Sequence, residues 1–340
     1  MTHHSRTVPW IVDNQKYALV GLSVKVAGAV PDKASQNLRV LSDPAFQIPT
    51  TWKEWLGTIR TEEVEQCNLF LLSQLTSHAP EILNAEDQML QRRVWNFYVG
   101  LLLSSTFAPA HRPVLITGSC RGGEIGIRQQ QDLDCPIPLI ANHYPAITRE
   151  HIQLAAQLGE NLEALVSAPI AGGRWRLLRT LQVYVDARVT AEVVDRIHQY
   201  CRCVEGLIFP AVGKSRQQFK SKTELFIGSG HHDLMGDIYD VRSAVEHLHE
   251  SRYLESFDRV SRLDLVKKEA IVERIAREAI RRVISNTNLW PHFDNTAALS
   301  KFWSLGSTEQ RRLWGDTIDP LGALANFDPT YINDGELGGP

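Results

Sequence analysis

The spacing of hydrophobic residues changes along the chain. Within Tyr17–Val26 the apolar residues Val20, Leu22 and Val24 lie two apart, which is the spacing of a β-strand with one buried face. The proline-containing stretch Asp43–Pro49 then predicts a loop. The first 50 residues therefore indicate strands joined by irregular segments.

Beyond Thr51 most apolar residues recur at helical spacing. Thr61–Thr76 begins with two acidic residues and carries four leucines, which predicts a helix. A second helix with a broad apolar face is predicted over Ala85–Ser104. The other predicted elements are a strand at Val114–Thr117 and helices at Thr148–Ser167, at Arg174–Arg188 and nearly continuously from there to Ser285.

These patterns divide the chain into three parts. Residues 1–189 form an irregular α+β N-terminal region, residues 190–305 an α-helical domain, and residues 306–340 a tail rich in Gly, Pro and Asp. Trp52, Trp55 and Trp95 are expected in the core. We therefore predict a mainly α protein in which an antiparallel helical bundle follows an α+β region.

Composition excludes several classes of protein. The 340 residues are 43% hydrophobic and 22% charged, which excludes a disordered or coiled-coil chain. The formal net charge of −3 provides no global basic field, so any nucleic-acid contact requires a local patch. Five scattered cysteines, no apolar run near the length of a membrane span and no evident signal peptide predict a cytoplasmic protein without a membrane contact.

Several segments resemble ligand-binding motifs without meeting their spacing. In Val212–Ser215 the Gly-Lys-Ser sequence lacks the preceding glycine of a P-loop, because Gly206 is two residues too distant. The glycine-rich segment Gly118–Gly126 is typical of a surface turn. Neither His231–Asp233 nor Cys201–Cys203 has the ligand spacing of a metal site. The sequence therefore indicates no metal and no cofactor.

The segment Met235–Glu250 is the most informative part of the chain. At 100° per residue, a helix here gathers one apolar stripe, made of Ile238, Val241, Val245 and Leu248. Arg242 lies beside this stripe, His247 points about 140° away from its centre, and His249 lies closer to it. Taken alone, the pattern is also typical of a solvated helix with an Arg242–Glu246 ion pair.

This segment resembles the HEPN superfamily. Tyr239–His247, Tyr-Asp-Val-Arg-Ser-Ala-Val-Glu-His, is similar to the Arg-x4–6-His motif of HEPN ribonucleases in the form found in Apea-like HEPN domains. Three other segments resemble HEPN helices in the same order, namely Val194–Pro210, Gln217–Gly228 and Val272–Ile284. The resemblance covers about residues 190–305 and implies an HEPN-like antiparallel helical bundle.

The resemblance implies a metal-independent endoribonuclease. Arg242 would stabilise negative charge on the scissile phosphate, His247 would act as general acid and base, and Ser243 would add a hydrogen bond. The RNA 2′-hydroxyl would attack the phosphorus, which leaves a cyclic phosphate end. His249 satisfies an Arg-x6-His spacing and is the alternative catalytic histidine.

The resemblance also implies partners. The HEPN domain would form a homodimer, and residues 1–189 would meet a trigger or regulatory partner, in phage defence or toxin-like growth control. For the RNA substrate, one basic cluster without an acidic residue is the candidate contact, made of Lys214, Arg216, Lys220 and Lys222.

Two departures from the family pattern favour another class of protein. Glu246 precedes His247 where the family has an apolar residue, and Leu248 follows it where the family has glycine. A carboxylate at this place repels phosphate. The alternative is a catalytically inactive HEPN scaffold for dimerisation, nucleotide binding or regulation, and a plain helical interaction module is the third possibility.

Overall fold

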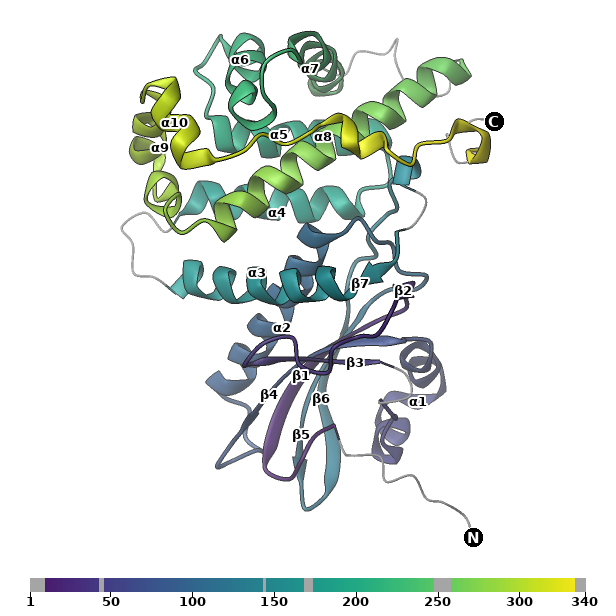
Figure 1. Ribbon diagram of the computed structural model, residues 1–340. Helices are drawn as coiled ribbons and strands as arrows, with labels where there is room; N and C mark the ends of the chain where they lie inside the picture. Colours follow the sequence, from purple (N-terminus) through teal and green to yellow (C-terminus); the bar gives the residue numbers. More distant parts are fainter. Residues whose placement is uncertain (1–9, 43–45, 143–144, 168–173, 248–257, 334–340) are drawn as a thin grey trace. The chain divides into compact units, whose positions relative to one another are not determined.

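The chain folds into two compact units. The computed structural model describes residues 10–42, 46–142, 145–167, 174–247 and 258–333 (Figure 1). The sheet unit comprises Met1–Pro136 and Pro145–Ala164, and the helical unit comprises Ile137–Tyr144 and Leu165–Pro340. The protein is mainly α-helical with a five-stranded antiparallel sheet, which agrees with the mainly α character that we predicted.

The sheet has the strand order β3-β4-β1-β5-β6. Its strands are β1 (Gln15–Leu22), β3 (Leu38–Ser42), β4 (Leu69–Thr76), β5 (Val114–Arg121) and β6 (Glu124–Asp132). A separate parallel pair joins β2 (Val26–Ala27) to β7 (Ile147–Thr148). The predicted turn near Gly118–Gly126 is confirmed as the β5–β6 hairpin, where Gly122 and Gly123 adopt positive φ angles.

The prediction of a helix over Thr61–Thr76 is wrong in its second half. Helix α1 ends at Glu65, and Leu69–Thr76 is strand β4, which pairs with β1 on one edge and β3 on the other. Its first five residues are all buried. A strand covered on both faces shows a continuous apolar run instead of an alternation, and such a run is easily read as one side of a helix.

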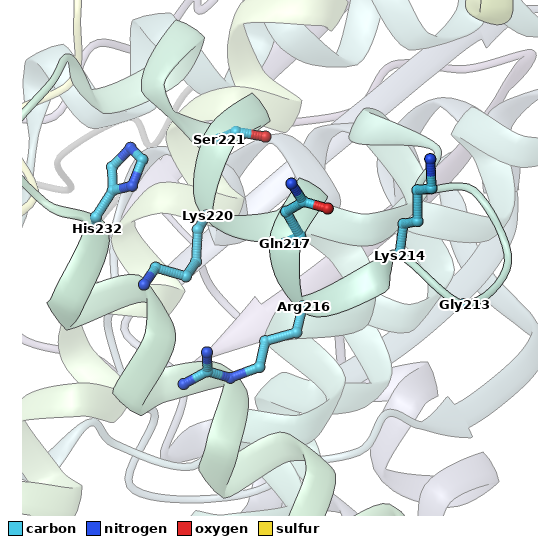
Figure 2. A pocket seen from close by; sticks show the side chains of 7 residues that line it. All are labelled: Gly213, Lys214, Arg216, Gln217, Lys220, Ser221 and His232. Atoms are coloured by element: carbon cyan, nitrogen blue, oxygen red, sulfur yellow. The ribbon is translucent and has the colours of Figure 1, made fainter.

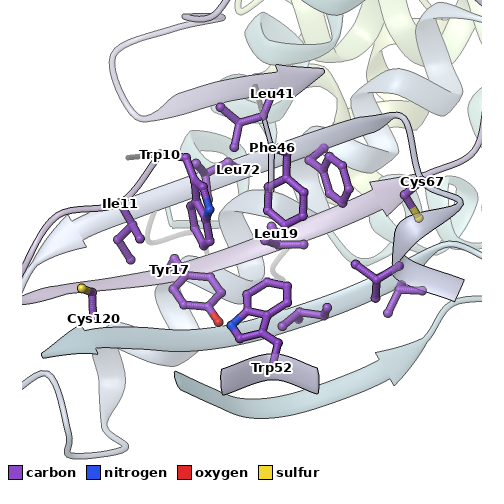
Figure 3. Packing of buried hydrophobic residues seen from close by; sticks show 14 residues of the cluster. Trp10, Ile11, Tyr17, Leu19, Leu41, Phe46, Trp52, Cys67, Leu72 and Cys120 are labelled. Carbon is purple, nitrogen blue, oxygen red and sulfur yellow. The ribbon is translucent and has the colours of Figure 1, made fainter. Parts of the chain in front are cut away.

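An aromatic cluster fills the core between the sheet and α1 (Thr50–Glu65). Trp52 is fully buried and stacks on Tyr17, with ring centroids 5.9 Å apart (Figure 3). Trp55 is 52% exposed, so its predicted place in the core is wrong. The reason is that α1 buries few residues, namely Trp52, Thr61 and Val64, and is interrupted at Gly57, whose backbone is not helical (φ 70°, ψ 179°).

Two long helices complete the sheet unit. Helix α2 spans Ala85–Ser104, as predicted, and α3 spans Arg149–Ser167. They approach closely at Gly100, where a Cβ atom would lie 2.2 Å from the carbonyl oxygen of Ala155. Glycine is therefore required at this contact.

The helical unit is built around α5. Its helices are α4 (Trp175–Val189), α5 (Val193–Ile208), α6 (Ser215–Ile227), α7 (His232–Glu246), α8 (Arg259–Ser285), α9 (Thr296–Trp303) and α10 (Ser307–Trp314). Helix α5 packs against α4, α6, α7 and α8. At Gly206 a Cβ atom would lie 2.1 Å from Oγ1 of Thr180, so the α4–α5 contact also requires glycine.

Buried charges connect the three central helices. Arg196 on α5 pairs with Glu269 on α8, and Glu273, one turn later, accepts hydrogen bonds from Tyr184 on α4 and from Arg277. Each of these five side chains is buried. Because an unpaired buried charge is strongly destabilising, this network links α4, α5 and α8 in one arrangement.

The unit boundaries differ from those predicted. The second segment of the helical unit begins at Leu165, and α4 packs on α5, so the expected boundary at residue 190 divides a helix pair. The expected tail after residue 305 also belongs to this unit. Trp314 is buried and stacks on Phe226 with ring centroids 4.3 Å apart, and the Ile318 N–H donates to the Phe226 carbonyl.

None of the helices within the described residues combines the length and the hydropathy that crossing a bilayer requires.

Candidate functional site

Arg242 lies on α7 and faces α5. Helix α7 buries Met235, Ile238 and Tyr239. The side chain of Arg242 is 17% exposed, and its guanidinium carbon lies 5.5 Å from the centroid of the Tyr239 ring. The positive charge is therefore partly withdrawn from solvent and rests beside an aromatic ring.

Two carboxylates touch this guanidinium through one nitrogen. Nη2 of Arg242 lies 3.2 Å from Oε2 of Glu205 on α5 and 3.7 Å from Oε2 of Glu246 on α7. The Nε atom of Arg242 is buried and has no hydrogen-bond partner among the described residues. By contrast, Arg216 closes its fork on Asp240 with two bonds of 2.8 Å. Among the described residues, the fork of Arg242 is thus only partly occupied.

A histidine from α5 joins the same cluster. Nε2 of His198 lies 2.7 Å from Oε2 of Glu246, and the side chain of His198 is 17% exposed. The hydrogen bond from His198, aided by the charge of Arg242, holds the pKa of the Glu246 carboxyl below its ordinary value. Glu246 is therefore ionised at neutral pH and connects an imidazole to a guanidinium. We call His198, Glu205, Arg242 and Glu246 the α5–α7 cluster.

The other predicted catalytic residues lie at the end of α7. The helix ends at Glu246, one residue before His247, whose backbone N–H donates to the Ser243 carbonyl at 3.1 Å. Ser243 is half-buried and His247 is exposed. His249 and Leu248 lie outside the described residues. The helix predicted over Met235–Glu250 is thus described only as far as Glu246, and His247 occupies its C-cap.

A basic groove lies between α6 and α7. It has a volume of about 590 Å³ and is lined by Gly213, Lys214, Arg216, Gln217, Lys220, Ser221 and His232. Figure 2 shows Arg216 and Lys220 extending from α6 on the same side, with His232 on the neighbouring helix. The groove therefore contains three of the four cationic residues predicted to contact RNA.

The fourth cationic residue, Lys222, has another role. Its Nζ donates to the carbonyls of Ile208 and Phe209 at 2.8 and 3.1 Å and lies 5.1 Å from the Trp303 ring centroid. Burial lowers the pKa of this ammonium group. Lys222 thus satisfies carbonyls at the C-terminal end of α5 and is not part of the groove lining.

Sequence reasoning did not identify His198 and Glu205 as site residues. They are seven residues apart on α5, so they occupy the same face two turns apart. That spacing is a usable signal, but the partner of His198 is 48 residues away along the chain. Only the packing of α5 on α7 brings the two elements together.

Among the described residues, no group of three or more His, Cys, Asp or Glu side chains is arranged to hold a metal ion. The chain matches no protein-family model, no curated protein and no solved structure in the comparisons made.

Proposed function

We propose that the helical unit is a metal-independent endoribonuclease of HEPN type, acting in phage defence or toxin-like growth control. The proposal rests on the partly occupied guanidinium of Arg242. It shares the carboxylate of Glu246 with the imidazole of His198, and a second imidazole, that of His247, comes next after Glu246 in the chain. Phosphodiester cleavage needs a cation that stabilises the charged phosphorane and groups that exchange protons near neutral pH. Arg242 and His247 supply these two kinds of group.

In this reaction the RNA provides its own nucleophile. The 2′-oxygen attacks the neighbouring phosphorus, the bond to the 5′-oxygen breaks, and a cyclic phosphate and a 5′-hydroxyl result. Nε of Arg242 is buried without a hydrogen-bond partner among the described residues, so the guanidinium would turn to offer this donor to an equatorial phosphate oxygen, and Ser243 suits an additional hydrogen bond. His247 donates the proton that the leaving 5′-oxygen requires.

The basic groove supports RNA as the substrate class. Lys214 and Lys220 line a space of about 590 Å³ next to the first turn of α6, which has no side-chain cap, and Arg216 lines it with its charge paired to Asp240. Free backbone N–H groups at a helix N-terminus favour phosphate. The same helix α7 carries His232 at the groove and Arg242 in the α5–α7 cluster. An RNA strand lying along α7 would use both.

The proposal includes a homodimer through the HEPN-like bundle. In the single chain, Val241, Ala244 and Val245 on α7 are only half-buried. A second copy packed on this face would cover them and place two Arg242 side chains in one cleft. Residues 1–189 would then serve as a sensor for a trigger.

One observation favours a second candidate function, an inactive HEPN-like scaffold. Glu205 and Glu246 both lie within 4 Å of Arg242 and oppose the approach of a phosphate. In this alternative the ion pairs stabilise the α5–α7 contact, and the unit serves dimerisation, nucleotide binding or regulation.

The deciding experiment compares expression toxicity and RNA integrity for the full-length wild type and for Arg242→Ala, His247→Ala and His249→Ala. A ribonuclease gives fragments with cyclic phosphate ends, and Arg242→Ala stops their formation. Lys301→Gln on α9, an exposed lysine of the same unit, is the control and leaves cleavage unchanged. If purified wild type leaves every RNA intact, with each trigger preparation tested, the result would favour the inactive scaffold.

A further inference from the structure

Glu246 connects the two helices of the α5–α7 cluster through a single oxygen. Its Oε2 atom lies 2.7 Å from Nε2 of His198 and 3.7 Å from Nη2 of Arg242. Glu246 is 44% exposed, whereas His198 and Arg242 are each 17% exposed. The imidazole and the guanidinium are therefore fixed relative to each other at the partly exposed edge of the α5–α7 contact.

The carboxylate also selects the tautomer of His198. An ionised carboxylate can only accept hydrogen bonds, so Nε2 of His198 must carry the hydrogen that it donates to Glu246. In the neutral imidazole the lone pair is then on Nδ1. No described residue forms a hydrogen bond with Nδ1. His198 is thus held in the form that can accept a proton.

The proposed reaction requires one proton acceptor and one proton donor. The 2′-hydroxyl must lose its proton as the oxygen attacks phosphorus, and the 5′-oxygen must gain one as its bond to phosphorus breaks. A single histidine can perform only one of these transfers before it is reset. His247 follows Glu246 directly in the chain, and His198 reaches the same carboxylate from α5.

We infer that His198 is the proton acceptor for the 2′-hydroxyl, positioned by Glu246, and that His247 is the donor for the leaving 5′-oxygen. This inference rests on the proposed ribonuclease function. It also gives Glu246, which departs from the HEPN motif, a role in the reaction, because Glu246 orients the imidazole of His198. The charged group that contacts His198 is Glu246 on α7; Arg242 on α7 and Arg202 on α5 act in turn on Glu246, and Glu205 on α5 pairs with Arg242.

The test uses two kinds of substrate with the full-length protein. One is an RNA oligonucleotide, and the other is the set of four nucleoside 3′-(4-nitrophenyl phosphates), whose nitrophenolate leaves without a proton. On RNA, His198→Gln and His247→Gln each lose about 100-fold or more in kcat. On the nitrophenyl esters His247→Gln returns to within about threefold of wild type, whereas His198→Gln stays impaired, because only the acceptor is still needed.

The pH dependence gives a second readout. A proton acceptor acts in its neutral form, so wild-type kcat rises with pH on the acidic side, and His198→Gln lacks this rise. Glu246→Gln loses about tenfold or more, because an amide can donate to Nε2 and so stabilise the wrong tautomer. Glu309→Gln on α10 is the matched control, since Glu309 is 45% exposed and also ion-paired, and it retains wild-type kcat.

Binding separates a chemical defect from a folding defect. His198→Gln and, as a second variant, His198→Asn are expected to bind a 2′-deoxy oligonucleotide as the wild type does. The inference is overturned if wild type cleaves RNA, Arg242→Ala stops cleavage and both His198 variants cleave at the wild-type rate. It is also overturned if the nitrophenyl esters rescue His198→Gln and not His247→Gln. If wild type cleaves neither substrate, the ribonuclease function itself is wrong.

Discussion

The hydroxyl of Tyr184 on α4 donates a hydrogen bond of 2.8 Å to Oε1 of Glu273 on α8, and both side chains are fully buried. The same oxygen accepts from Nε of Arg277 at 2.9 Å. One carboxylate oxygen of Glu273 thus joins α4 to α8 in the helical unit. The bonds are made away from water, so losing this carboxylate would leave buried donors without an acceptor.

We expect Glu273→Ala to lower the free energy of unfolding by about 3–5 kcal/mol, because it leaves the Arg277 charge buried without this partner. Tyr184→Phe should cost about 1–3 kcal/mol, since Glu273 loses one buried donor. Urea denaturation followed by circular dichroism measures both. Glu309→Gln, in an exposed pair on α10, is the control and should change the free energy of unfolding by less than about 1 kcal/mol. A loss below 1 kcal/mol for Glu273→Ala would contradict a structural role of the network.

The stability that Glu246 contributes should depend on pH. Its pKa is lowered in the folded chain from an ordinary value of 4.5, so its contribution is complete above that value and is lost as pH falls through the lowered folded pKa. We expect the wild type to melt at a higher temperature than Glu246→Gln at pH 7, and the two melting temperatures to converge only when the pH falls below the lowered folded pKa of Glu246. Because Glu246 is partly exposed, the difference at pH 7 corresponds to about 1 kcal/mol or less. A constant difference from pH 3 to pH 7 would be inconsistent with this linkage.

Removing the charge of Glu205 should strengthen RNA binding. Glu205 lies 3.2 Å from Arg242 and is 15% exposed, so Glu205→Gln keeps the shape of the contact and removes one neutralising charge. An ion pair of this kind contributes about 0.2–1 kcal/mol, which corresponds to an affinity gain of up to about fivefold. Fluorescence anisotropy with a 2′-O-methyl oligonucleotide measures the dissociation constant without cleavage. Weaker binding by Glu205→Gln would mean that Arg242 needs this carboxylate to hold its position.

The lysines near α6 should separate into two classes. Lys214→Gln and Lys220→Gln are expected to weaken RNA binding, and each should reduce the salt slope of log Kd by about 0.7 if its contact with a single-stranded phosphate is lost. Lys222→Gln should instead lower thermal stability and leave the salt slope unchanged, because Lys222 binds carbonyls at the end of α5. Lys301→Gln is the control for both measurements. An equal slope change for Lys222→Gln would place that residue in the RNA contact after all.

The cysteines should differ in reactivity. All five are free thiols within the described residues, and only Cys135 is not buried. Burial raises the pKa of Cys67 to about 12 and that of Cys201 as well, so both thiols are protonated and shielded at neutral pH. We expect iodoacetamide to modify Cys135 before the others in the native protein, and all five cysteines in urea. Early modification of Cys201, read by peptide mass spectrometry, would contradict the packing of α5.

Local pattern predicted an element whose helical spacing is clear along its length. Helix α2 follows from the broad apolar face of Ala85–Ser104, and these bounds are confirmed, although its C-terminal half, Asn96–Ser104, is buried on all sides. Strand β4 was missed because Leu69–Ser73 is buried on both faces, which removes the period that identifies a strand. The unit boundary was missed because no polar linker marks the start of α4. The local spacing of apolar residues does not show which distant parts of the chain pack on an element.

The candidate site was predictable to the same limited extent. Arg242 and its contact with Glu246 follow from spacing within one helix. His198 does not, because its contact depends on how α5 packs against α7, which no local spacing determines. Lys222 was included with the RNA contacts because its charge is visible in the sequence, whereas its burial against Trp303 is not.

The division of the chain also determines how the protein can be cut. The chain passes between the units at residues 136/137, 144/145 and 164/165. The first segment of the helical unit, residues 137–144, is short. Within it the Ile137 N–H donates to the Arg188 carbonyl at 2.6 Å. One cleavage at any crossing therefore leaves a piece of one unit covalently attached to the other. A fragment that begins at residue 165 lacks Ile137, and one that begins at residue 145 carries α3 of the sheet unit. No single truncation yields either unit whole and free of the other, because residues 137–340 keep 145–164 of the sheet unit and residues 1–164 keep 137–144 of the helical unit. Deletion series and limited proteolysis will therefore report on both units together.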